Sequence, residues 1–132
     1  MSSKPTAADT VCPCGAGKSM SECCGRWHSG EPAPTAEALM RSRYSAFVIR
    51  NEAYLLKTWH ASTRPASVPM EAQQKWLGLK IVSAREGAAD VAEVEFIARF
   101  RIGGGSAARL HERSRFYKEK GQWFYVDGSV LN

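Results

Sequence analysis

Apolar and polar residues alternate along the second half of the chain, which is the pattern of β-strands with one buried face. The alternation is clearest over residues 90–102, where Val94, Phe96, Ala98 and Phe100 would lie on one face and charged residues on the other. This segment is therefore predicted to be a strand whose apolar face packs against a core.

Three further segments carry the same strand signal, at residues 76–87, 108–119 and 122–130. The glycines at 103–105 supply a flexible turn, and residues 119–121 supply a tight turn between the last two segments. Because short connections join antiparallel neighbours, these segments predict a three- or four-stranded antiparallel meander.

The first half of the chain instead repeats its apolar residues at three- and four-residue steps, which indicates helices. Thr35 can cap a helix that begins near Ala36, and Asn51 can end it and cap a second helix over residues 52–60, before Pro65. The inward face of the first helix would be formed by Leu39, Met40, Arg43, Tyr44, Phe47 and Val48. Helices followed by strands predict an α+β fold, with the helices packed on one face of a curved antiparallel sheet.

The composition is that of one ordinary domain with a small appendage. The chain has 132 residues, of which 44% are hydrophobic. No apolar run approaches the ~18 residues that a membrane-spanning helix needs. The N-terminal residues lack the apolar stretch of a signal peptide. Together with cysteines grouped as metal ligands, this predicts a cytoplasmic protein.

All four cysteines lie within the segment CPCGAGKSMSECCG, residues 12–25. Its centre, GAGKS, is similar to the end of a phosphate-binding P-loop, but the first glycine of that motif would have to stand where Cys12 stands, and no strand precedes it. A metal site fits better, because four thiolates complete a tetrahedral shell and Gly15 and Gly17 can adopt the positive φ of a tight loop. Two free thiol pairs or strained disulfides are the alternatives. The predicted ligands are Cys12, Cys14, Cys23 and Cys24.

The same segment resembles the SEC-C motif, best known from the C-terminal tail of the translocase ATPase SecA. In that tail the last ligand is usually histidine, whereas this chain has Cys24 in the place. The resemblance implies one metal ion per chain, usually zinc, with iron as the alternative that a thiolate shell also suits. Because the motif occurs beside many unrelated domains, it does not imply translocation.

Much of the net charge of +5 comes from residues 99–120. A basic sheet face of this kind can meet RNA, ribosomes or an acidic protein. No aromatic residue interleaves the arginines as in a platform for stacking bases, so we interpret the segment as a solvated strand face and do not favour nucleic acid. The cations are Arg99, Arg101, Arg109, Arg113, Arg115, Lys118 and Lys120, against Glu112 and Glu119.

Several runs together resemble the YchJ-type family of bacterial proteins: PTAEALMRSRYSAF, WLGLKI, VEFIARFR, HERSRF and QWFYVDG. The resemblance covers nearly the whole chain, including the cysteine segment. It implies a cystatin-like, nuclear-transport-factor-like cone, in which a bent sheet wraps helices around a pocket. The expected organisation is a flexible tail at 1–11, a zinc knuckle at 12–28, a linker at 29–35 and the cone at 36–132.

Residues 109–118 carry the most chemical information in the predicted sheet. Glu112 and Ser114 would lie between Leu110 and Phe116 on the inward face, where an unpaired carboxylate is costly. Glu112 is therefore either a general base or ligand anchor in the pocket, or a structural carboxylate bonded to a helix side chain such as Arg43 or Tyr44. The candidate pocket residues are Tyr44, Trp59, His60, Glu112, Ser114 and Tyr125.

Other polar residues carry weaker signals. Trp59 and His60 would end the second helix at the mouth of the cone, where His60 can shuttle protons or complement the helix dipole. Tyr125 and Asp127 would share a face, with Asp127-Gly128 forming a turn. No nucleophile, base and acid fall on one face, and four thiolates leave a metal no open position for catalysis.

The sequence therefore favours a non-catalytic binding or adaptor protein that contacts a protein partner through its metal knuckle. By analogy with the SEC-C motif, that partner would belong to the secretion or translation machinery. The alternative is a small-molecule binding protein or enzyme that uses a pocket around Glu112.

Overall fold

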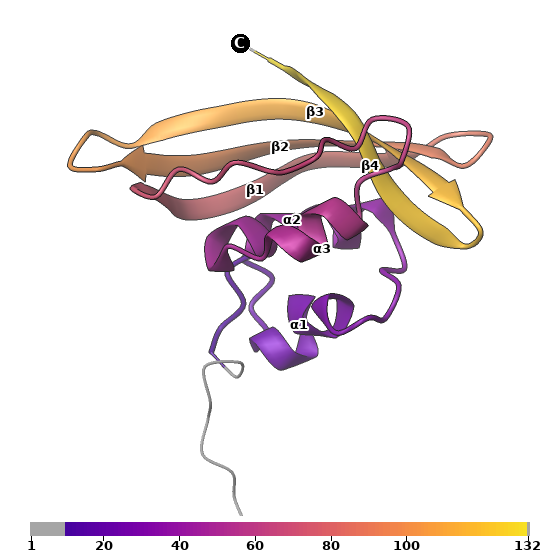
Figure 1. Cartoon of the computed structure of the whole chain (residues 1–132), viewed down its shortest axis with the longest axis horizontal. Coiled ribbons are helices and arrows are strands. Elements are labelled where there is room, and N and C mark those ends of the chain that lie inside the picture. The colour runs from indigo at the N-terminus through magenta and orange to yellow at the C-terminus, as the bar shows by residue number, and fades with distance from the viewer. Residues whose placement is uncertain (1–9, 132) are drawn as a thin grey trace, which may run out of the picture.

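The structure, a computed structural model, describes residues 10–131 (Figure 1). Its strands β1 (Gln74–Glu86), β2 (Val91–Ile102), β3 (Ala108–Glu119) and β4 (Gln122–Val130) form one antiparallel sheet in sequence order. The predicted meander is confirmed, with four strands.

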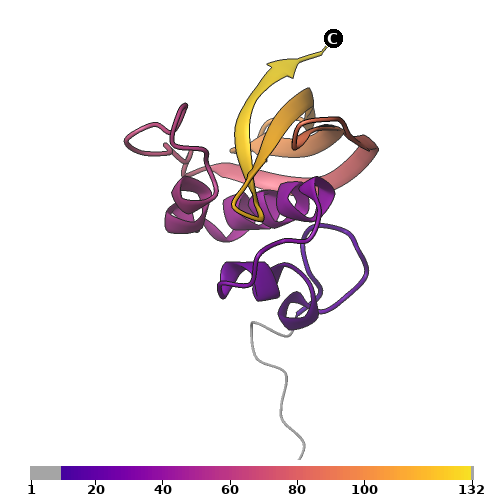
Figure 2. The ribbon, with the colours of Figure 1, turned by 90° about the vertical axis from the view of Figure 1, so that its right-hand side faces the viewer.

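One face of the sheet is apolar and lies against the helices, and we call it the inner face. Val94, Phe96 and Ala98 of β2 are buried there, together with Phe116 of β3. Their neighbours in sequence point to the outer face, as strand alternation requires. The pairing is irregular at two places in β1 and at one place in β4, and Figure 2 shows a strongly curved sheet.

Two helices cover the inner face (Figure 1). Helix α2 (Ala36–Ile49) begins where it was predicted, and the Thr35 hydroxyl accepts a hydrogen bond from its first turn. Asn51 caps α3 (Glu52–Lys57) in the same way. Together with the sheet, these helices confirm the predicted α+β class.

Helix α3 is shorter than predicted. It ends at Lys57, so Trp59 and His60 follow it instead of ending it. Main-chain hydrogen bonds join Thr58 and His60 to Tyr125, which ties this segment to β4. The physical reason is that pairing with the last strand satisfies backbone groups that another helical turn would have satisfied internally.

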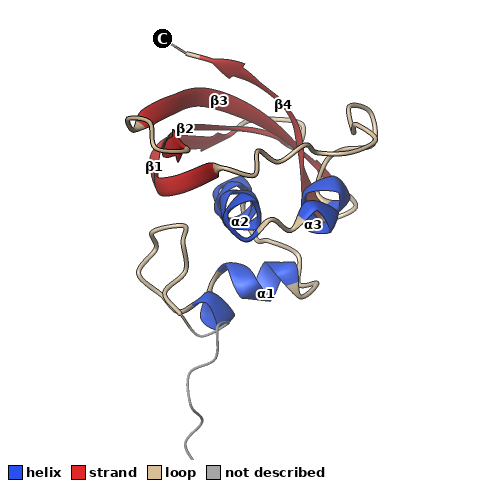
Figure 3. Ribbon diagram, turned by 60° about the vertical axis from the view of Figure 1, so that its left-hand side comes forward, coloured by secondary structure: helices blue, strands red, loops and turns tan. Residues whose placement is uncertain are grey.

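The cysteine segment forms a third layer on the far side of α2 (Figure 3). It contains a short 3-10 helix, η2 (Met20–Glu22), and α1 (Cys24–His28). Helix α2 is therefore covered on two sides, and Ser42 and Ser45, which face away from the sheet, are fully buried. The cysteines and the inward residues of α2 belong to one continuous buried cluster.

The expected turn at Asp127-Gly128 is wrong, because both residues lie within β4. A bulge in β4 falls between the residues that pair with Arg115 and Phe116. The extra residue reverses the alternation, so Tyr125 faces inward and Asp127 faces outward, contrary to the prediction that they share a face.

Residues 1–9, the greater part of the predicted tail, lie outside the described residues. Within the described part of the chain, no helix has the length and apolar character needed to cross a membrane.

Candidate functional site

A cavity of about 310 Å³ lies between α2 and the inner face of the sheet. This volume falls at the lower end of the range of about 300 to 1,000 Å³ that is typical of small-molecule sites. The wall is mainly aromatic and apolar, with a few polar groups. The lining residues are Met40, Arg43, Tyr44, Phe47, Trp59, Gln74, Trp76, Phe96, Ala98, Leu110, Glu112, Ser114 and Tyr125.

Arg43 brings a charged group into this wall from the middle of α2. The residue is only 4% exposed, and its Nη1 donates to the Leu55 carbonyl at 2.9 Å and to Thr58 Oγ1 at 2.7 Å. The guanidinium carbon also lies 4.5 Å from the Tyr125 ring centre and 5.1 Å from that of Trp59. Burial lowers the Arg43 pKa to about 10. The group stays cationic at neutral pH.

In the part of the chain that the structure describes, no acidic side chain forms an ion pair with the Arg43 cation. Its two hydrogen bonds go to uncharged oxygens, and the nearby rings contribute cation–π attraction. A buried charge is normally paired, so a cation held this way in a cavity wall is available to a ligand.

Glu112 is the acidic group of the cavity. Its Oε2 accepts a hydrogen bond from Ser114 Oγ at 3.1 Å, and among the described residues neither Arg43 nor Tyr44 donates one to it. Burial raises the Glu112 pKa, although the Ser114 bond and the attraction of Arg43 both oppose the shift. The carboxylate is partly stripped of water and has acceptor capacity to spare.

Gly128 makes room for that carboxylate. It pairs with Ser114 across β3 and β4, and a β-carbon built there would lie 2.9 Å from Glu112 Cδ. The requirement is for space, because the φ of Gly128 is not positive. Gly128, half of the dipeptide that looked like a turn in the sequence, therefore lies directly behind a residue of the cavity wall.

The structure brings together five of the six candidate pocket residues. Tyr44, Trp59, Glu112, Ser114 and Tyr125 all line the cavity. Sequence reasoning missed Trp76, Phe47 and Gln74. The signal available for Trp76 and Phe47 was their large apolar side chains, which indicate burial but do not distinguish a cavity wall from a core.

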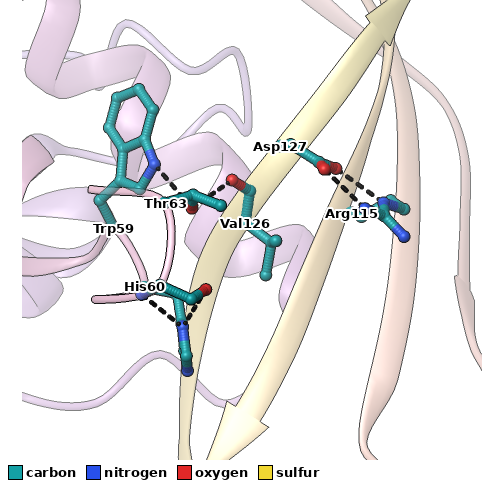
Figure 4. A network of polar contacts seen from close by, with 7 residues as sticks. Trp59, His60, Thr63, Arg115, Val126 and Asp127 are labelled. Atoms are coloured by element: carbon teal, nitrogen blue, oxygen red, sulfur yellow. Dashed lines mark hydrogen bonds and ion pairs between the residues drawn. The ribbon is translucent and has the colours of Figure 1, made fainter. Parts of the chain in front are cut away.

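His60 is the candidate that does not line the cavity. Its side chain points away from that of Trp59 (Figure 4), and its Nε2 lies 2.6 Å from Glu119 Oε1 at the surface. Trp59 is held in the cavity wall by its indole nitrogen, which donates to Thr63 Oγ1 at 3.1 Å. Asp127 is bonded to Arg115 on the outer face, away from Glu112.

The second candidate site is the cysteine cluster beneath α2. The four sulfur atoms lie within 4.8 Å of one another, and all four thiols are free. Cys14 Sγ and Cys23 Sγ are 3.6 Å apart. Tetrahedral zinc with bonds of about 2.3 Å would place its sulfurs about 3.8 Å apart. The four cysteines therefore fit a metal ion that is bound by four thiolates.

The local backbone explains how the four sulfurs converge. A short hairpin joins Thr10 to Met20 and Cys12 to Lys18 by main-chain hydrogen bonds. Gly15 and Gly17 within it adopt the predicted positive φ, at 86° and 85°. Cys23 immediately precedes α1 and Cys24 begins it, so the second ligand pair lies at the start of a helix.

Helix α2 supports the cluster from above. Arg41 Nη1 donates to the Cys14 carbonyl at 2.9 Å, and Ser45 Oγ lies 3.5 Å from Cys12 Sγ. His28 bonds the Ser42 carbonyl at 2.8 Å, so it is not a ligand but fixes α1 to α2. Cys12, Cys14 and Cys24 are buried, and only Cys23 is partly exposed. Such a closed shell holds the fold together and leaves a metal no substrate position.

The neighbouring thiols favour ionisation of one cysteine and oppose that of two others. Contacts with Cys14 and Cys24 lower the Cys12 pKa, whereas contacts with Cys12 and Cys14 raise that of Cys24. Burial, followed by contact with Cys14, raises the Cys23 pKa to about 11. Four thiolates thus need a compensating cation, which a divalent metal ion supplies.

Comparison with known proteins gives a consistent result. Residues 35–128 match the family described as the YchJ middle NTF2-like domain. A UPF0225 protein of Xanthomonas campestris pv. campestris is 51% identical over 93% of this chain and 97% of its own length. One from Bordetella pertussis is 53% identical over 96% of this chain and 98% of its own length.

Two solved structures share the fold. The solution structure of a SEC-C motif containing protein from Rhodopseudomonas palustris has a TM-score of 0.81 at 34% identity, over 92% of this chain and 98% of that one. The crystal structure of a SEC-C motif containing protein from Psychrobacter arcticus has a TM-score of 0.78 at 29% identity, over 95% of this chain and 85% of that one. The predicted resemblances to the YchJ-type family and to the SEC-C motif are confirmed.

Proposed function

Because this chain belongs to the UPF0225 family and carries the YchJ middle NTF2-like domain, we propose that its cone binds a small ligand and that its cysteine knuckle is a structural zinc site. The observation that carries the ligand proposal is the buried Arg43 guanidinium, which has no ion-pair partner among residues 10–131 and faces the same cavity as Glu112.

The two charged groups restrict the chemistry of the ligand. Arg43 offers only hydrogen-bond donors, and an ionised Glu112 offers only acceptors. A ligand that satisfies both has an acceptor and a donor side by side, as in a primary amide or an undissociated acid. An anion would meet repulsion from Glu112, and a cation would meet repulsion from Arg43.

The rest of the cavity lining favours a ligand whose remaining part is apolar. Phe47, Trp59 and Trp76 supply aromatic surfaces, and Phe96 and Leu110 complete the wall on the sheet side. Aromatic ligands prefer offset or edge-on contacts with such rings. The ligand we propose is therefore a small, uncharged aromatic molecule with an amide-like end.

Three probes of matched shape test this chemistry: benzamide, benzoate and benzylamine. We expect benzamide to bind best at neutral pH, with a dissociation constant of about 1 mM for so small a molecule. Glu112→Gln should improve benzoate binding several-fold, because it removes the repelling charge. Tightest binding of benzylamine, or equal binding of all three, would overturn the assignment of Arg43 and Glu112 as anchors.

Zinc is the metal we propose for the knuckle, with one ion per chain. The spacing of the sulfurs and their burial support a closed tetrathiolate shell, and thiols of this kind persist in the reducing cytoplasm. Elemental analysis of protein purified without added metal, beside titration of free thiols, tests the proposal. One iron per chain, or four freely reactive thiols, would contradict it.

A second candidate function is contact with a protein partner through the knuckle. Val11, at the edge of the knuckle, is 73% exposed and lies next to the exposed loop of residues 15–18. An exposed apolar residue beside an exposed loop suits a partner interface. Val11→Asp should then reduce capture of cross-linked partners from a bacterial lysate without changing metal content, and unchanged capture would remove this candidate.

A further inference from the structure

The charged residues on the outer face of the sheet are arranged differently at its two ends. At the end that contains Glu93 and Glu95, basic and acidic residues alternate across the strands. Arg115 makes two hydrogen bonds to Asp127, and Glu95 contacts both His111 and Arg113. Glu93 pairs in register with Arg85 on one side and Arg115 on the other.

The opposite end of the outer face holds basic residues alone. Arg99 lies directly opposite Arg109, and Arg101 lies directly opposite Lys75. Lys80 points to the same face, opposite Ile97. We call this set the basic end, and its members are Lys75, Lys80, Arg99, Arg101 and Arg109.

The basic end is exposed and its charges are uncompensated. All five side chains are exposed, and none of them takes part in an ion pair within the described chain. The strand segments 72–85 and 96–111 contain no acidic residue, and the connecting turn is Gly-Gly-Gly-Ser-Ala. Like charges directly opposite each other across strands destabilise a sheet. Two such pairs lie side by side here, which needs a reason other than stability.

We propose that the basic end binds the phosphate backbone of a nucleic acid strand. Neighbouring strands are about 4.8 Å apart, and alternate residues along a strand are about 6.8 Å apart. The five cations span three strands and the length from Arg101 to Ile97 along β2, so they cover a patch of roughly 10 Å by 14 Å. A patch of this size and charge neutralises several consecutive phosphates and releases their counterions. Guanidinium groups suit phosphate oxygens especially well.

Nucleic acid fits this surface better than an acidic protein. Protein interfaces have an apolar core with the charged groups around it. The outward positions among these cations are occupied by Gly78 and the half-buried Ile97, which provide no such core. Phosphate contacts alone are sufficient for nucleic acid binding that is independent of sequence. None of the outward residues described at the basic end is aromatic, which removes base stacking there and leaves the backbone contacts in place.

The test uses a fluorescein-labelled oligouridine RNA of about 20 nucleotides and measures anisotropy at several salt concentrations. We expect a dissociation constant of about 10⁻⁶ to 10⁻⁴ M at physiological salt. Binding should weaken steeply as the salt concentration rises. In Arg99→Gln/Arg101→Gln, affinity at low salt should fall at least tenfold. The slope of log affinity against log salt should become shallower by about 1.4, at about 0.7 for each lost contact.

Arg85→Gln/Arg115→Gln is the matched control, because it removes the same charge from the same face at the paired end. It should change RNA affinity less than threefold. Equal losses in the two double variants would show attraction by net charge alone and would overturn the proposal, as would affinity that is indifferent to salt. A labelled peptide of about 20 glutamates that binds more tightly than the RNA, with loss in Arg99→Gln/Arg101→Gln, would assign the surface to an acidic protein instead.

Discussion

The carboxyl group of Glu112 lies against the backbone of Gly128, where a β-carbon would come within 2.9 Å of Glu112 Cδ. Gly128→Ala should therefore push the carboxylate out of its place beside Ser114, at a cost of about 1 to 3 kcal/mol in the free energy of unfolding. We expect benzamide affinity to fall at least tenfold in the same variant, as measured by calorimetry.

Gly104→Ala is the control for this change. Gly104 lies in the turn between β2 and β3, and a β-carbon there would meet no atom within 4 Å. Stability and benzamide binding should both stay close to wild type. If Gly128→Ala behaved like Gly104→Ala, the close approach of Glu112 to position 128 would be wrong.

The raised pKa of Glu112 has a consequence for stability. Folding raises this pKa by burial, so ionisation of Glu112 opposes folding. The contribution of Glu112 to the free energy of unfolding is fully present below the pKa of the unfolded state, and it is lost as pH rises through the pKa of the folded state. Glu112→Gln should therefore be more stable than wild type at pH 7, with a difference that shrinks as pH falls through the raised folded pKa and is absent below about 4. Urea unfolding of both proteins at several pH values checks this, and a difference that grows towards low pH would contradict it.

The cysteine cluster should stabilise the whole chain, because it shares a buried cluster with α2. Cys24→Ser should abolish metal binding and lower the melting temperature by about 10 °C or more, which corresponds to about 3 kcal/mol in a chain of this length. Unfolding should remain a single transition when followed by circular dichroism and by tryptophan fluorescence.

Lys18→Ala serves as the control, since this side chain is exposed between the two ligand pairs and its contribution to the hairpin comes from the main chain. It should melt like wild type. Two separate transitions in Cys24→Ser, with the sheet melting at its original temperature, would mean that the knuckle and the cone fold independently.

The basic end should reduce the stability of the sheet. Arg109→Glu converts its repulsion with Arg99 into attraction and should raise the free energy of unfolding by about 0.5 to 1 kcal/mol at low salt. The gain should diminish in about 1 M salt, where screening acts over about 3 Å. A destabilised variant, or a gain that is independent of salt, would show that Arg109 has another role in the fold.

Much of the architecture could be predicted because each element has a local signal. Strand alternation, the caps Thr35 and Asn51, and the glycine-rich turns depend on residues near one another in the sequence. The cysteines, grouped within thirteen residues, are another local signal. Glu112 was found because an acidic residue on an apolar row is conspicuous even without a structure.

What escaped prediction depends on contacts between distant segments. The bulge in β4 that separates Tyr125 from Asp127, and the pairing of Thr58 and His60 with that strand, have no local signature. The second buried side of α2 is signalled only by its small residues Ser42 and Ser45, which read equally well as a solvated face. The two like-charge pairs of the basic end became visible only when the strand register was known.

The measurement that tests the proposed function most directly is the movement of the four tryptophan indole resonances as benzamide is added to about 10 mM, well above its expected dissociation constant. Trp59 and Trp76 line the cavity, whereas Trp27 and Trp123 lie outside it. We predict that the first two indole signals shift in a saturable manner while the other two stay in place. Unmoved signals from Trp59 and Trp76, or equal movement of all four, would contradict a ligand site between Arg43 and Glu112.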